Sequence, residues 1–142
     1  MDIRPLTDRY AVSPQIAPED LPAIRAAGFA TVIDNRPDAE IPHDLQETAM
    51  RRAAEAAGLT FVSNPVIGGA ITMANVDAQR AAIDAATGPV LAYCASGNRS
   101  SIVWALANAG RMPTDALIAI PAGHGYRLDG FRRDIDALAA QG

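Results

Sequence analysis

Short apolar runs alternate along the chain with alanine-rich segments that have helical spacing. Runs that are bounded by Gly or Pro are typical of strands buried on both faces of a parallel sheet. The pattern predicts strands at 30–34, 60–66 and 89–94, with a weaker one at 10–16. Pro14 would confine this last strand to the edge of a sheet, because proline has no N–H to donate to a neighbouring strand.

The segments between these runs predict helices, most of which are followed by glycine or proline. Strand and helix alternate, and this order predicts a three-layer α/β sandwich with right-handed crossovers and a mostly parallel sheet of four to five strands. We find no low-complexity linker or shift in composition, so residues 1–142 are expected to form one domain. The predicted helices are 18–27, 43–57, 75–86, 100–109, 114–120 and 129–140.

Composition narrows the classes of function. The 142 residues are 49% apolar, which is enough for one core, and a formal net charge of −4 without a basic run argues against a nucleic-acid partner. No apolar run approaches the roughly 18 residues that span a membrane. A single cysteine and a start without a signal-peptide core predict a reducing, cytoplasmic location. Neither metal-ligand spacing nor a nucleotide-binding motif is present, so no metal or cofactor is expected.

The only cysteine, Cys94, ends a predicted buried strand and is followed by Ala95-Ser96-Gly97-Asn98-Arg99. We call residues 95–99 the oxyanion loop. Ligands of α/β sheets bind at such strand ends, where backbone N–H groups and a helix N-terminus favour anions. Arg99 adds a forked cation that matches an oxyanion. Such surroundings favour a thiolate over a thiol at neutral pH, which would make Cys94 a nucleophile.

A lone cysteine at the end of a buried strand is more often a small apolar residue than a nucleophile. The rare combination of Cys94, Gly97 and an Arg-Ser pair in one strand-to-helix loop favours the functional interpretation instead. In this interpretation Ser100 donates a hydrogen bond to the sulfur and eases its departure from a covalent intermediate.

The pattern Cys-x-x-Gly-x-Arg-Ser resembles the catalytic loops of cysteine-dependent phosphatases and of rhodanese sulfurtransferases. Four residues separate Cys94 from Arg99, which is the rhodanese length; phosphatases normally have five. Segments from about residue 10 to 110, among them Ala27-Gly28-Phe29-Ala30-Thr31-Val32-Ile33-Asp34-Asn35-Arg36-Pro37-Asp38, resemble the beta-lactamase hydrolase-like, phosphatase-like domain family. The resemblance implies a tyrosine-phosphatase-like fold, with Cys94 as nucleophile and residues 95–99 as oxyanion cradle. Members have been described both as phosphatases and as sulfur transferases.

Two features depart from the phosphatase pattern. Tyr93 stands where histidine usually precedes the cysteine, and the loop 67–75 after the third strand holds no carboxylate. Asp77 is either a helix-start residue, which we favour, or a displaced general acid. Arg36 either reaches a substrate anion or, as we favour, pairs with Asp34 or Asp38 to hold its loop.

Three functions remain open from the sequence. The leading one is a phosphatase that forms a phosphocysteine on Cys94, with a small anionic phosphate ester as substrate. The second is a rhodanese-type sulfurtransferase that carries a persulfide on Cys94, and the missing acid favours it. The third is a module that binds an anion or phospho-ligand with little catalysis.

Overall fold

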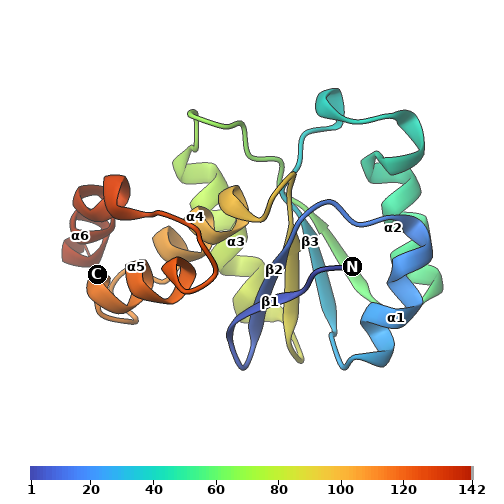
Figure 1. The fold of residues 1–142 in the computed structure, drawn as a ribbon, viewed down its shortest axis with the longest axis horizontal. Helices are drawn as coiled ribbons and strands as arrows, with labels where there is room; N and C mark the ends of the chain where they lie inside the picture. The colour runs from blue at the N-terminus through green and yellow to red at the C-terminus, as the bar shows by residue number, and fades with distance from the viewer. Residues whose placement is uncertain (142) are drawn as a thin grey trace.

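Five strands form one sheet in the computed structural model, which describes residues 1–141. The strand order is β1-β2-β5-β3-β4, and every neighbouring pair is parallel except β1 and β2. The carboxyl ends of the four parallel strands therefore meet at one edge of the sheet, the upper edge in Figure 1. The strands are β1 (Arg4–Thr7), β2 (Tyr10–Ser13), β3 (Thr31–Asp34), β4 (Thr60–Ser63) and β5 (Val90–Tyr93).

The predicted α/β architecture is confirmed, with two differences at the N-terminal side of the sheet. β1 was not predicted, because only Leu6 of its four residues is buried and no apolar run marks it. β2 was expected at an edge, which is wrong: it lies between β1 and β5. Pro14 does not interfere because β2 ends one residue before it, at Ser13.

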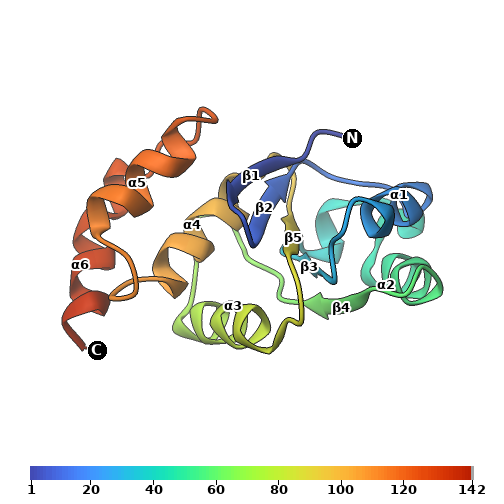
Figure 2. The same cartoon turned by 90° about the horizontal axis from the view of Figure 1, so that it is seen from below.

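Helices cover both faces of the sheet. α1 and α2 lie on one face, α3 and α4 lie on the other, and α5 and α6 pack against the outer side of α4 (Figures 1 and 2). None of the helices in residues 1–141 is long and apolar enough to cross a membrane. That the chain forms one domain stays a prediction. The helices are α1 (Leu21–Ala26), α2 (Glu47–Ala56), α3 (Met73–Ala85), α4 (Asn98–Ala107), α5 (Thr114–Ala122) and α6 (Arg132–Gln141).

Helix ends differ from the predictions where a cap or turn decides them. α3 begins two residues early because the Thr72 hydroxyl accepts the N–H of Asn75 and caps the helix. Residues 43–45 form a separate short 3₁₀ turn before α2, and α5 continues through Pro121 to Ala122.

The oxyanion loop leads into α4, which is buried in the core. All eight of its residues from Ser100 to Ala107 are buried, because α3, α5 and α6 surround it on the side away from the sheet. A helix that is buried on every side packs against its neighbours on every side, which limits its movement. Its N-terminus, and the loop before it, is therefore fixed relative to the strand ends.

Candidate active site

Cys94 lies at the end of β5, where the chain turns through the oxyanion loop into α4. Its side chain is buried, and Sγ accepts a hydrogen bond from the N–H of Gly97 at 3.1 Å. Gly97 has φ +96°, a left-handed conformation that other residues rarely adopt, and a Cβ there would collide with the Tyr126 hydroxyl. Glycine is therefore required for this turn.

The carbonyl groups of the oxyanion loop point away from its centre. Ala95 O accepts the N–H of Gln15 at 3.3 Å, and Ser96 O accepts the Tyr126 hydroxyl at 2.7 Å. Gly97 O accepts the backbone N–H of Ser101 in α4 at 3.0 Å. Within residues 1–141, the N–H groups of residues 95, 96, 99 and 100 have no protein acceptor. Unpaired N–H groups at a helix N-terminus make an anion site.

Arg99 completes this anion site. Its Nη1 donates to Glu40 Oε2 and to Val66 O, and its Nη2 donates to Glu40 Oε1, each at 2.8 Å. Guanidinium has five N–H groups, and these bonds use three, so Nε–H and one Nη2–H remain for an oxyanion. The hydrogen bonds to the Glu40 carboxylate raise the pKa of the Arg99 guanidinium above its usual value, so it stays charged.

Glu40 was missed by the sequence analysis, although it organises the cations of the site. Arg99 and then Arg36 hold the pKa of the Glu40 carboxyl below its usual range. Arg36 reaches Glu40 Oε1 through Nε and Gln15 Oε1 through Nη1, both at 3.2 Å. The expectation that the Arg36 side chain pairs with Asp34 or Asp38 is therefore wrong, since its acidic partner is Glu40.

Asp34 lies on the face of the sheet that α1 and α2 cover. Its Oδ1 accepts the backbone N–H of Arg36 at 2.9 Å, and it shares a row across the sheet with Tyr93 and Ser13. Tyr93 packs in the core beneath α1 and α2, so this row lies on that face. Asp34 Oδ2 has no hydrogen-bond partner among the described residues, and burial raises the pKa of the carboxyl to about 6.

Ser100 does not make the predicted bond to the sulfur. Its hydroxyl donates to Asn35 Oδ1 at 2.9 Å, and a hydroxyl has only one proton to donate. Asn35 belongs to a buried network centred on Gln79, which also bonds the Asn64 amide at 2.8 Å and the Tyr10 hydroxyl at 3.0 Å. This network joins β2, β3, α3 and α4 beneath the oxyanion loop.

Asp77 is not brought to the oxyanion loop. It is exposed in the second turn of α3 and lines a cavity with Arg80, Leu106 and Leu138, none of which belongs to residues 94–100. The described residues also include no cluster of three or more His, Cys, Asp or Glu side chains that could hold a metal ion.

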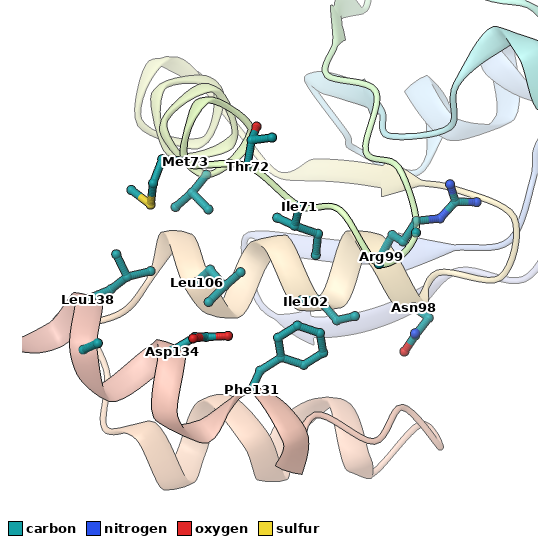
Figure 3. Close-up of a pocket in the computed structure, with 14 residues that line it drawn as sticks. Ile71, Thr72, Met73, Asn98, Arg99, Ile102, Leu106, Phe131, Asp134 and Leu138 are labelled. Carbon is teal, nitrogen blue, oxygen red and sulfur yellow. The ribbon is translucent and has the colours of Figure 1, made fainter.

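A larger cavity of about 680 Å³ begins beside the oxyanion loop and runs along α4. Figure 3 shows Asn98 and Arg99 at one end and Leu138 at the other, with apolar side chains between them. The loop 67–75 forms one wall and α6 forms the opposite wall.

The chain is similar to known proteins in sequence and in fold. A family model described as "Beta-lactamase hydrolase-like protein, phosphatase-like domain" matches residues 2–111. A beta-lactamase hydrolase-like protein of Xylella fastidiosa is 35% identical over 130 residues, covering 90% of this chain but only 30% of that relative. A corresponding protein of Agrobacterium fabrum is 31% identical, with 95% of this chain and 32% of that relative covered. The chain thus spans about a third of these relatives.

Solved structures share the fold. The crystal structure of nma1982 from Neisseria meningitidis has a TM-score of 0.82 and 34% identity, and the match covers 97% of this chain and 99% of that one. TpbA of P. aeruginosa, solved as a variant in complex with pTyr, has a TM-score of 0.70 and 18% identity, covering 98% and 88%. The predicted tyrosine-phosphatase-like fold is confirmed.

Proposed function

Because the chain belongs to the beta-lactamase hydrolase-like protein, phosphatase-like domain family, we propose that it is a cysteine-dependent phosphatase with Cys94 as nucleophile. The observation that carries the proposal is the arrangement around the sulfur. Within residues 1–141, the turn after Cys94 leaves four backbone N–H groups without a protein acceptor, and Arg99 keeps two N–H groups beyond those that bond Glu40 and Val66. These are the donors that would bind the oxygens of a phosphoryl group.

The reaction follows from this arrangement. The Cys94 thiolate attacks phosphorus, and the loop N–H groups with Arg99 stabilise the charge on the three equatorial oxygens. The bond to the leaving oxygen breaks, which gives a phosphocysteine. Water then attacks phosphorus, the electron pair of the S–P bond returns to sulfur, and phosphate is released. Glu40 holds Arg99 in place through two hydrogen bonds.

The proposed substrate is a small anionic phospho-compound. The complex of TpbA with pTyr supports this choice, because that protein has the same fold and binds an aryl phosphate. The cytoplasmic location of the chain stays a prediction.

Phosphate release tests the proposal directly. The protein is incubated with p-nitrophenyl phosphate beside the variants Cys94→Ser and Arg99→Lys. We expect Cys94→Ser to abolish release. Arg99→Lys should lower kcat/KM by about 100-fold or more. The lysine ammonium lacks the planar set of N–H groups with which arginine can bond Glu40 and an oxyanion at the same time. Release that survives Cys94→Ser would contradict the proposal.

A second candidate is sulfur transfer. One observation favours it: only four residues separate Cys94 from Arg99, as in rhodanese loops. Here Cys94 takes the outer sulfur of thiosulfate, sulfite leaves, and the persulfide passes to a thiol or to cyanide. Intact mass after thiosulfate treatment tests this function. A gain of one sulfur that reductant removes would support it, and an unchanged mass would exclude it for that donor.

If neither product forms, the remaining function is anion binding. A phosphate analogue would then raise the Tm without any turnover, and that rise should be lost in Arg99→Ala.

A further inference from the structure

The loop 67–75 follows directly after Val66, whose O accepts a hydrogen bond from Arg99, and it therefore starts beside the oxyanion loop. None of its side chains is free to donate a proton. Its only polar side chains are Thr72 and Asn75. The Thr72 hydroxyl donates to Asn75 Oδ1 at 3.0 Å. The Asn75 amide donates to Asn64 Oδ1 and to Pro65 O, both at 2.9 Å. The donors of both side chains are therefore used in hydrogen bonds that stabilise the conformation of the loop.

Glu40 is the only carboxylate in residues 1–141 with a hydrogen bond or ion pair to the oxyanion loop. It cannot serve as the acid while it holds the two arginines. Both of its oxygens accept bonds from Arg99, one accepts a further bond from Arg36, and these cations hold the carboxyl pKa below its usual range. An ionised carboxylate accepts protons in hydrogen bonds and donates none.

Asp134 is the one carboxylate that lines the large cavity, and it lies away from the oxyanion loop. Figure 3 shows it beside Leu106, with Phe131 and Ile102 between it and Asn98. Arg99 and Leu106 are separated by about 10 Å along α4, at 1.5 Å per residue. Asp34 and Asp77 face other parts of the molecule, as described above.

We propose, building on the phosphatase function proposed above, that the substrates are phosphate esters or anhydrides whose leaving group departs as a stable anion. Aryl, acyl and phosphoryl leaving groups belong to this class, and simple alkyl esters do not. The Cys94 thiolate forms the S–P bond as the P–O bond breaks, and the leaving oxygen keeps the electron pair and takes no proton from the protein. Water then adds to phosphorus and the sulfur leaves as thiolate.

The dependence of the rate on the leaving group tests this substrate class. The kcat/KM is measured for p-nitrophenyl phosphate, phenyl phosphate and phosphoserine, listed from the weakest to the strongest base as leaving group. This parameter reports P–O cleavage even where the later hydrolysis of the phosphocysteine limits kcat. A general acid levels such a series, since it contributes about 10²- to 10⁴-fold.

We expect p-nitrophenyl phosphate to exceed phenyl phosphate by about 100-fold or more in kcat/KM, with phosphoserine lower still. A smaller ratio between the two aryl esters means that a proton donor assists the departure of phenolate, and it overturns this inference while the phosphatase function stands. If no ester is hydrolysed in a manner that depends on Cys94, the phosphatase function fails, and the inference falls with it.

Three carboxylate variants identify a hidden acid if one exists. Glu40→Gln and Asp134→Asn remove the two candidates. Asp77→Asn is the matched control for loss of one negative charge, because Asp77 does not line the large cavity beside the oxyanion loop. We expect each variant to leave the ratio between the two aryl esters unchanged, whatever it does to the absolute rates. A variant that lowers activity on phenyl phosphate about 10-fold more than on p-nitrophenyl phosphate would identify that carboxyl as the acid and overturn the inference.

Discussion

Replacing Asp34 with asparagine should stabilise the protein at neutral pH. The carboxyl is 1% exposed, its Oδ2 has no partner among the described residues, and burial raises its pKa from 3.8 to about 6. The folded protein therefore binds this proton more tightly than the unfolded chain does. As the pH rises through the window from 3.8 to about 6, the unfolded chain loses the proton first, so the free energy of unfolding falls.

The magnitude follows from the two pKa values. A difference of about 2 units, at 1.36 kcal/mol each, corresponds to a penalty of about 3 kcal/mol once both states are ionised. At about pH 4.5 the same expression gives only about 1 kcal/mol. Asparagine keeps an oxygen that can accept the N–H of Arg36 and carries no charge. Asp34→Asn should therefore gain about 2 kcal/mol relative to the natural protein between about pH 4.5 and pH 7.5.

Urea unfolding measures this difference. Trp104 is the only tryptophan and is 2% exposed, so its fluorescence reports loss of the core around α4. All other titratable groups are common to both proteins, so their contributions cancel in the comparison. The free energies of unfolding of the two proteins should differ by more at about pH 7.5 than at about pH 4.5. An equal difference at both pH values, or a smaller advantage of Asp34→Asn at the higher pH, would contradict this prediction.

Three further substitutions probe the supports of the oxyanion loop. Gly97→Ala should weaken phosphate binding by about 10-fold or more, measured by calorimetry, because its Cβ would push Tyr126 away and φ +96° strains any residue but glycine; binding like that of the natural protein would contradict this. Tyr126→Phe removes the hydroxyl that bonds Ser96 O and should cost about 1 kcal/mol in urea unfolding, with kcat falling more than KM rises; an unchanged kcat would show that Ser96 O needs no such support. Gln79→Met removes the oxygen that accepts one N–H each from the buried Asn35 and Asn64 amides, and it should cost about 2–4 kcal/mol in thermal unfolding. A neutral effect would mean that water replaces the glutamine.

The parts of the fold that were predicted correctly carry their signal locally. β3 and β5 are short apolar runs next to glycine or proline, and Cys94, Gly97 and Arg99 lie within one loop whose spacing is visible in the sequence. Buried parallel strands have this appearance because both of their faces are covered. The position of the oxyanion loop at the strand ends followed from the same rule.

The parts that were missed depend on pairings between distant segments. Glu40 meets Arg99 across 59 positions, and it lies on a short 3₁₀ turn that no motif marks. Ser100 finds Asn35 across 65 positions, a contact that no local pattern indicates. The position of β2 inside the sheet likewise depends on its pairing with β1. β1 is half-exposed, and its sequence shows almost no hydrophobic pattern.

The most direct test of the proposed chemistry is to capture the covalent intermediate on Cys94. The protein is mixed with p-nitrophenyl phosphate, quenched within milliseconds in alkaline denaturant, digested and analysed by mass spectrometry. We expect one phosphoryl group on the peptide that contains Cys94, formed before steady-state release of phosphate and absent from Cys94→Ser. Phosphate release without any adduct on this peptide, at a rate that Cys94→Ser retains, would contradict it.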